Sequence, residues 1–430
     1  MTISACLWLG LFPLLQGGTY ASITYDKWVI MLVLTAFTFL CFLAEQIAPR
    51  SGASAPNGSR SPRARLSSRR LLPLILAAAL LFWTVLSCVF SGSGPETWLI
   101  GKAGRYEGLV THFCYFVLFV CFFFSRISLK PVLLSAAAGV TVFFTLVLFQ
   151  RGDANPLGLY PAGRSYELNP EFQGTIGNID MGTGYLLLLA GLFLCGILNA
   201  ARGIRQSGFG FHLIPLFAAF LITIYLIVTM EVQFGIVSLA ALVLFTLLRF
   251  LPKKWRLPLL IILIVLVLLT VWFWPGQGGG IWELHEILHG RSRLSFGSNR
   301  VAVWLYSLRL AGDAPLFGGG LATFVTRFNQ YLADHSLAIP HSQDGVLLPH
   351  YFDNPHNEYI ARLTDTGLPA MLLFLALLLF AVFHRRERWF PLLTPCSAAV
   401  LCYAVQAFFS FSICIVAPMF WVLLGQSFNE

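Results

Sequence analysis

The chain has 430 residues, of which 57% are hydrophobic and 11% are charged, and 39 of them are phenylalanine. With a mean hydropathy of +0.76, this composition excludes a soluble globular domain of that length. The formal net charge of +9 falls mainly in short loops between apolar segments, so it does not indicate a nucleic-acid-binding surface. The sequence therefore indicates a polytopic membrane protein.

Apolar segments recur along the whole chain, and a helix that crosses a bilayer needs roughly 20 such residues. We count about twelve of them, at residues 1–16, 27–45, 71–91, 109–124, 131–149, 182–199, 210–229, 232–250, 257–274, 358–382, 394–411 and 412–426. The first lacks the basic flank and cleavage site of a signal peptide. We expect an all-α protein with about 12 transmembrane helices, divided into an N-terminal bundle (residues 1–274), a large loop (275–357) and C-terminal helices (358–430).

Positive charge predicts the orientation, because Lys and Arg are retained on the cytoplasmic side of short loops. Alternate loops carry 17 of the 28 basic residues, namely Arg50, Arg60, Arg63, Arg65, Arg69, Arg70, Arg126, Lys130, Arg202, Arg205, Arg249, Lys253, Lys254, Arg256, Arg385, Arg386 and Arg388. We expect these loops and both termini in the cytoplasm. Residues 46–70, rich in Ser, Gly, Pro and Arg, are expected to form a disordered linker.

The opposite face carries three longer loops, at residues 91–108, 150–181 and 275–357. A connection of more than 80 residues is rare among short loops, and such exceptions tend to be functional. Six of the nine histidines lie in this last loop or at its end: His285, His289, His335, His341, His350 and His356.

A short helix is expected over residues 282–290, and it would carry His285 and His289 four residues apart, a spacing compatible with a metal. No third ligand follows at a convincing spacing, so an exposed helix face is the favoured interpretation. All nine cysteines lie in or beside apolar segments, which indicates small hydrophobic residues and not a disulfide framework or metal site. A Walker A sequence and an Asp-x-Asp pair are both missing, which argues against an ATP-driven pump and a metal–nucleotide-sugar site.

His356 is an ionisable side chain where the large loop meets an apolar helix. Asn354 is expected to cap this helix and Pro355 to take its first position. His356 would then lie in the first turn, where free N–H groups attract anions and the helix dipole disfavours imidazolium. A neutral imidazole beside an anion site suits a general base that works near neutral pH.

Earlier in the large loop, Val301, Leu305 and Leu308 have the spacing of an apolar helical stripe. The sequence predicts a helix on the membrane surface with Arg300 at its polar start. An Arg there could bind a pyrophosphate bidentately, or it could be an ordinary interfacial Arg. The glycines of residues 315–320 (PLFGGG) permit a tight turn that brings the backbone close to another element or a ligand, and packing is favoured.

The other outer loops add further polar groups. Arg105 and Glu107 stand between glycines before an apolar segment, so they either pair with other loops or bind a polar ligand. Arg164 lies in the loop of residues 150–181. At the end of this loop Asn178 is expected to cap the next helix, with Asp180 close enough to the boundary to be functional.

Four motifs in order resemble the O-antigen ligase and polymerase superfamily, the membrane enzymes that transfer lipid-linked glycans. The motifs are residues 104–109 (GRYEGL), residues 174–178 (GTIGN), Arg300 and Trp304 ahead of residues 315–320 and Phe324, and His356 and Asn357 with Leu363 and Gly367. Departures are Ala370, where a second small residue such as glycine is common, and the insertion of residues 48–70.

The resemblance implies a GT-C-like membrane fold and a metal-independent, inverting glycan transfer from undecaprenyl pyrophosphate to an acceptor hydroxyl. The reaction would take place on the outer face of a bacterial cytoplasmic membrane during surface polysaccharide assembly. His356 would be the general base and Arg300 the phosphate ligand. The expected substrate-binding residues are Arg105, Glu107, Arg164, Asn178 and Asn357, with no metal and no cofactor. The acceptor, a lipid core, another repeat unit or a protein hydroxyl, is left open.

A lipid-linked glycan flippase or another secondary transporter is the alternative, since it too would be polytopic and basic. Transporters usually place ionisable groups near the bilayer midplane and often have repeated halves. Glu45, Asp180 and Glu231 instead fall near the ends of apolar segments. Polar residues gather on one face, which favours an enzyme.

Overall fold

The computed structural model describes residues 1–47, 68–207, 213–337, 339, 342–343, 346–347, 352–387 and 390–429. The helices are α1 (Thr2–Cys6), a π-helical turn η1 (Leu7–Leu11), α2 (Ile23–Ile47), α3 (Ser68–Phe90), α4 (Pro95–Trp98), α5 (Leu109–Phe124), α6 (Leu129–Arg151), α7 (Ile179–Ser207), α8 (Leu213–Thr229), α9 (Gln233–Leu248), α10 (Lys253–Trp272), α11 (Gly279–Leu288), α12 (Arg300–Asp313), α13 (Phe324–Asp334), α14 (Glu358–Phe383), α15 (Pro395–Gln406) and α16 (Ala417–Ser427).

Strand structure in the described residues is limited to three antiparallel pairs. They are β1 (Phe172–Gln173) with β2 (Gly177–Asn178), β3 (Ser342–Gln343) with β4 (Val346–Leu347), and β5 (Arg386–Glu387) with β6 (Phe390–Pro391). In the first pair Phe172 lies opposite Asn178 and Gln173 opposite Gly177. The chain is therefore a mostly helical membrane protein, as the composition predicted.

Each of the twelve apolar segments coincides with helical structure, but the helices differ in length. Among the described residues, six helices are long and apolar enough to cross a membrane: Ile23–Ile47, Leu71–Phe90, Leu129–Arg151, Ile179–Ala201, Lys253–Trp272 and Glu358–Phe383. Thr2–Leu11, Leu109–Phe124, Leu213–Thr229, Gln233–Leu248 and Pro395–Gln406 are shorter apolar helices. A helix of 16 residues rises only about 24 Å, less than the roughly 30 Å hydrocarbon core. The count of about twelve spans thus stays a prediction.

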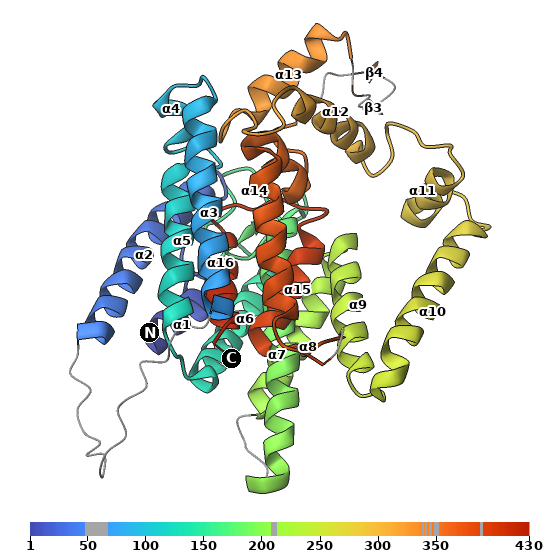
Figure 1. Ribbon diagram of the computed structural model, residues 1–430. Helices are drawn as coiled ribbons and strands as arrows, with labels where there is room; N and C mark the ends of the chain where they lie inside the picture. Colours follow the sequence, from blue (N-terminus) through green and yellow to red (C-terminus); the bar gives the residue numbers. More distant parts are fainter. Residues whose placement is uncertain are drawn as a thin grey trace.

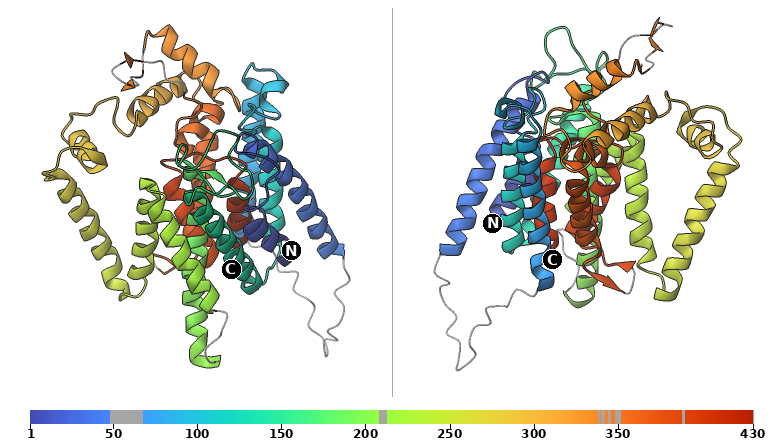
Figure 2. Two further views of the ribbon diagram at one scale, coloured as in Figure 1. Left: turned by 180° about the vertical axis from the view of Figure 1, so that it is seen from behind. Right: turned by 45° about the horizontal axis from the view of Figure 1, so that its top comes forward.

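The helices form a bundle, and α12 and α13 lie across one end of it. In Figure 1, α3, α5, α14, α15, α16 and α7 form the body, while α12 and α13 lie above it and α10 stands at one edge. Both views of Figure 2 show the same separation of α10. The turn between α9 and α10 is at the end opposite α12 and α13, and α10 begins there with Lys253 and Lys254.

The body is packed through close helix pairs, above all α7 with α15, α5 with α16, and α3 with α14. Gly191 allows the first of these approaches, because a Cβ there would lie 2.4 Å from the backbone nitrogen of Ala399. Small residues at helix contacts are the usual means of association in membranes, where lipid is as apolar as the helix surface. The result is a continuous apolar core that includes ten residues of α7 between Met181 and Cys195.

The predicted linker lies largely outside the described residues. The helix α2 extends to Ile47 and α3 begins at Ser68, so residues 46–47 and 68–70 of the predicted linker belong to these helices. Residues 48–67 are not among those the structure describes.

The predicted surface helix is present as α12, and its two sides differ. Ala302, Val303 and Tyr306 are buried in a small apolar cluster with α13, while Leu305 and Leu308 point outward with exposed fractions of 37% and 50%. The predicted stripe is thus the outward side of the helix. An outward apolar stripe suits a helix that lies on a membrane surface.

The start of α14 differs from the sequence prediction, in which Asn354 caps the helix and His356 lies in its first turn. The cap is Asn357, whose Oδ1 accepts hydrogen bonds from the backbone nitrogens of Tyr359 and Ile360, both at 3.0 Å. The Oδ1 of Asn354 instead accepts from the backbone nitrogen of His356 at 2.8 Å. The φ of His356 is +48°. The prediction was wrong because Asn354 closes its own tight turn ahead of the helix.

A break in α14 at Gly367 receives the glycine loop of residues 315–320. Gly367 has φ 81° and ψ 173°, so the helix loses its regular hydrogen bonds there. The carbonyl oxygens of Thr364 and Asp365 accept from the backbone nitrogens of Gly319 at 3.0 Å and Gly320 at 2.8 Å, and Leu368 N donates to the oxygen of Pro315 at 2.8 Å. The prediction that these glycines serve a close backbone approach is confirmed.

The variant Gly367→Ala should destabilise the protein. A side chain at φ 81° is strained, which costs of order 1–3 kcal/mol, and its Cβ would lie 2.0 Å from the Leu316 oxygen. Thermal unfolding in detergent should show a lower midpoint. Gly312→Ala on α12 is the matched control, since a Cβ there meets nothing within 4 Å and it should leave the midpoint unchanged or slightly raised. An unchanged midpoint for Gly367→Ala would refute the account of the break.

Candidate functional site

A cavity of about 590 Å³ lies near the N-terminal ends of α5, α7 and α14, and His356 lines it. Its walls also include Asn178 and Asp180 from the start of α7, Lys102 and Arg105 from the loop before α5, and residues of the segments 352–356 and 411–415. Motifs that are far apart in the sequence thus meet at one cavity. A concave site with a few convergent polar groups is the usual form of a binding or active site.

The loop before α14 fixes the position of His356. The indole nitrogen of Trp304 donates to the backbone oxygen of Pro355 at 2.9 Å, so α12 is tied to the residue next to His356. The imidazole ring stands edge-on to Phe411, with ring centroids 5.3 Å apart. This packing holds the ring at the cavity wall.

Arg300 begins α12, one helical turn before Trp304. Its Nη1 donates to the backbone oxygen of Gly297 at 3.3 Å, and its Nε is buried without a hydrogen-bond partner among the described residues. The charge of Arg300 acts on the carboxylate of Asp180, which lines the cavity. Arg300 therefore has an unused donor and lies near the site that contains His356.

Arg105 is paired with a residue of another loop, which is one of the two alternatives that the sequence left open. Its guanidinium forms an ion pair with Asp353, with Nε 2.8 Å from Oδ2, and lies 4.3 Å from the centroid of the Phe411 ring. Both partners line the 590 Å³ cavity. Lys102, which the sequence reasoning did not single out, adds a further cation there.

Glu107 lies near Arg105 in sequence but faces a different cavity. The hydroxyl of Tyr115 donates to its Oε1 at 2.7 Å. Removal from water raises the pKa of Glu107 to about 8, although the Tyr115 hydrogen bond acts in the opposite direction. The structure thus separates Glu107 from His356, and the carboxyl group is largely protonated at neutral pH.

The three remaining predicted binding residues fall in different places. Asn178 lines the large cavity, and its Oδ1 also accepts from Asp180 N at 2.8 Å, which confirms the predicted cap of α7. Asn357 is 1% exposed and is committed to capping α14. Arg164 is exposed, and its nearest recorded partner is Asn169, with Nη1 3.4 Å from Oδ1. The structure does not bring Arg164 to the cavity.

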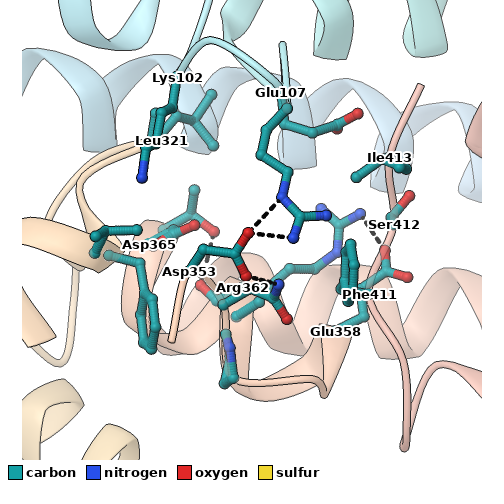
Figure 3. Close-up of a pocket in the computed structure, with 18 of the residues that line it drawn as sticks. Lys102, Glu107, Leu321, Asp353, Glu358, Arg362, Asp365, Phe411, Ser412 and Ile413 are labelled. Carbon is teal, nitrogen blue, oxygen red and sulfur yellow. Dashed lines mark hydrogen bonds and ion pairs between the residues drawn. The ribbon is translucent and has the colours of Figure 1, made fainter. Parts of the chain in front are cut away.

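A second cavity of about 120 Å³ lies beside the first (Figure 3). Glu358, Arg362 and Asp365 of α14 face it together with Glu107 and Asp353. The Nη2 of Arg362 donates to Glu358 Oε1 at 2.7 Å, and the hydroxyl of Tyr403 donates to Glu358 Oε2 at 2.7 Å.

Sequence reasoning assigned no role to these three residues of α14. The available signal was their spacing. Glu358 and Arg362 stand four residues apart and Asp365 follows three later, within a segment otherwise apolar enough to cross a membrane. Ionisable side chains in such a segment usually face a functional interior.

The histidine pair on α11 is held by structural contacts. The helix runs from Gly279 to Leu288 and not over residues 282–290, with His289 as its C-cap. The imidazole centroids of His285 and His289 are 4.1 Å apart, and their Nδ1 atoms lie 3.0 Å from Val271 O and 2.8 Å from His285 O. Within the described ranges no group of three or more His, Cys, Asp or Glu could hold a metal ion. His341 and His350 lie outside these ranges.

In a comparison with protein families, residues 217–375 match the family model described as O-antigen ligase. The match runs from α8 into α14 and includes Arg300, His356 and the ionisable residues of α14. A search of curated proteins found no match to the chain. The predicted resemblance to this family is therefore confirmed over residues 217–375, and the motifs of residues 104–109 and 174–178 lie outside the match.

The variant Glu107→Gln should flatten the pH dependence of stability. Because the pKa of Glu107 rises from 4.5 to about 8 on folding, the folded state binds more protons between these values. Stability should therefore fall as pH rises through this window. Thermal unfolding in detergent between pH 5 and pH 9 should show a smaller decline for Glu107→Gln than for the natural protein, and Glu167→Gln, at an exposed site, should keep the full decline. Equal slopes for all three proteins would contradict the assignment.

Proposed function

We propose that the chain, whose residues 217–375 match the O-antigen ligase family model, transfers a glycan from undecaprenyl pyrophosphate to an acceptor hydroxyl. The family supports a membrane glycan ligase or polymerase in polysaccharide biosynthesis. The observation that carries the finer proposal is the meeting of His356, Asn178 and Arg105, from three distant motifs, at one 590 Å³ cavity with Arg300 close by.

In the proposed step, His356 accepts the proton of the acceptor hydroxyl. The hydroxyl oxygen attacks the anomeric carbon of the donor as the bond from that carbon to the pyrophosphate oxygen breaks. Attack from the side opposite the leaving group inverts the anomeric configuration. The bond pair leaves with undecaprenyl pyrophosphate, so one glycosidic bond replaces one phosphoester bond. A base within reach of the hydroxyl typically contributes 10²–10⁴-fold.

The pyrophosphate leaving group needs fixed positive charge where negative charge develops. We assign this role to Arg300, whose Nε has no protein partner in the described part of the chain, with Lys102 and Arg105 adding charge at the cavity wall. Fixed guanidinium groups can serve a pyrophosphate without a divalent cation, so the proposed reaction is metal-independent. Arg164 could contribute only if its exposed loop folded over the cavity.

The proposed site faces the extracytoplasmic side of a bacterial cytoplasmic membrane. His356 lies just before α14 and next to α12, whose Trp304 donates to Pro355. The turn between α9 and α10, after which α10 begins with Lys253 and Lys254, lies at the other end of the bundle (Figure 1). Positive loops are retained in the cytoplasm, which supports this orientation and an outer-face substrate.

Replacement of His356 should lower the transfer rate by about 10²–10⁴-fold. His356→Asn is the better variant, because Asn tolerates the left-handed backbone of this residue, and His356→Ala serves beside it. His335→Ala, at an exposed position on the end of α13, is the matched control. The readout is undecaprenyl pyrophosphate released by purified protein in the presence of a chelator. A rate within a factor of two of the natural protein would show that His356 is not the base.

Replacement of Arg300 by Ala should lower kcat by about 10²-fold, the usual loss when one group that stabilises developing charge is removed. Arg300→Lys should recover only part of the rate, because an ammonium group cannot bind two phosphate oxygens in the planar arrangement. Arg309→Ala, on the exposed part of the same helix, should keep the natural rate. A similar loss at Arg309 and Arg300 would indicate a general effect on α12 and not a phosphate ligand.

A further inference from the structure

The 120 Å³ cavity holds ionisable groups that the proposed transfer step does not use. It shares five wall residues with the large cavity: Lys102, Arg105, Asp353, Phe411 and Ile413. The ion pair of Arg105 and Asp353 thus stands between a large chamber with His356 and a small chamber with Arg362 and Asp365. Figure 3 shows Asp353 between Asp365 and Phe411 on this wall.

Two buried polar atoms beside the small cavity lack protein partners. The Oδ1 of Asp365 and the Nε of Arg362 have no hydrogen-bond partner among the described residues, and Arg362 is only 8% exposed. Leaving such atoms unpaired costs free energy, more so for charged groups. Both residues line the small cavity, so a ligand there could donate to the carboxylate of Asp365 and accept from the guanidinium of Arg362.

The charge around the cavity disfavours a phosphate. Arg105 and Arg362 are already paired with Asp353 and Glu358, and Asp365 adds a carboxylate. A bound anion would meet Asp365 directly, with only Lys102 as an uncommitted cation in this part of the wall. A bound metal is also disfavoured, because the described residues contain no suitable cluster of three ligands.

An uncharged polyol matches both parts of the wall. A hydroxyl donates one hydrogen bond and accepts two, so neighbouring hydroxyls can serve a carboxylate and a guanidinium together. Leu321, Phe324 and Val325 form an apolar side of the same cavity, against which the C–H face of a sugar ring can pack. A volume of about 120 Å³ holds several water molecules or one sugar ring, but not two.

We propose that this cavity is a saccharide subsite for one uncharged sugar ring, which donates a hydroxyl to Asp365 and accepts from Arg362. The inference rests on the proposed function, because it makes the ring a part of the donor or acceptor glycan next to the reacting sugar. The ring would lie in the small cavity, whereas the pyrophosphate would lie in the large cavity, near Arg300.

Direct binding tests the subsite without needing transfer. The probes are a panel of hexoses, N-acetylhexosamines and their disaccharides, and saturable binding to the purified full chain is measured by saturation-transfer NMR. Asp365→Asn removes the acceptor charge, and Ala361→Phe fills the cavity from α14. Asp334→Asn on α13 and Ala376→Phe lower on α14 are the matched controls. Thermal unfolding identifies any variant that does not fold.

We expect at least one sugar to bind the natural protein, with binding weakened tenfold or more in Asp365→Asn and Ala361→Phe and unchanged in both controls. Binding should also survive in His356→Asn, so a failure of the transfer proposal would leave the subsite standing. If no panel sugar binds, or if all variants bind equally, the cavity is only a water-filled polar space and the inference is overturned.

Kinetics then identify the glycan that supplies the ring. If it belongs to the acceptor, Ala361→Phe should raise the acceptor KM about tenfold and leave the donor KM unchanged. The reverse pattern assigns the ring to the donor. Unchanged values of both KM in a folded Ala361→Phe variant would contradict a subsite of either kind.

Discussion

The insertion of residues 315–320 into the break of α14 at Gly367 is the contact on which the site depends. Within a membrane every backbone N–H and C=O needs a protein partner, and here the nitrogens of Gly319 and Gly320 satisfy the carbonyls of Thr364 and Asp365. The hydroxyl of Ser87 on α3 also donates to the backbone oxygen of Asp365 at 2.9 Å. The first turns of α14 are thereby locked to both the large loop and α3. This fixes Arg362 and Asp365 just before the break and, through the capped start of the helix, His356 ahead of them.

The two cavities share a wall but differ in their other polar groups. The large one has His356, Asn178 and Asp180, and the charge of Arg300 acts on the Asp180 carboxylate. The small one has Glu358, Arg362 and Asp365. One ion pair, Arg105 with Asp353, belongs to both. A change at this pair should therefore affect both cavities, whereas changes at His356 or Asp365 act on one.

The sequence predicted the helices well because the bilayer imposes long apolar segments, and each of the twelve coincides with helical structure. It predicted the start of α14 wrongly, because Asn354 and Asn357 are both able to cap and only the tertiary structure selects Asn357. The sequence reasoning found ionisable groups only near segment ends and so overlooked Arg362 and Asp365, which α14 carries in its first turns. The meeting of His356, Asn178 and Arg105 was not predictable by spacing, since it depends on how three loops fold together. Glu107 shared a motif with Arg105, yet the turn between them sends it to Tyr115.

The central claim is that the chain forms a glycosidic bond and does not merely move a lipid-linked glycan. The most direct measurement follows purified protein in proteoliposomes that contain the undecaprenyl-pyrophosphate-linked glycan, with soluble acceptor outside. Covalent product and donor translocation are recorded in the same vesicles. The account predicts new glycosidic product with free undecaprenyl pyrophosphate in equal amount and no protein-dependent translocation. Translocation without covalent product would contradict it and indicate a transporter.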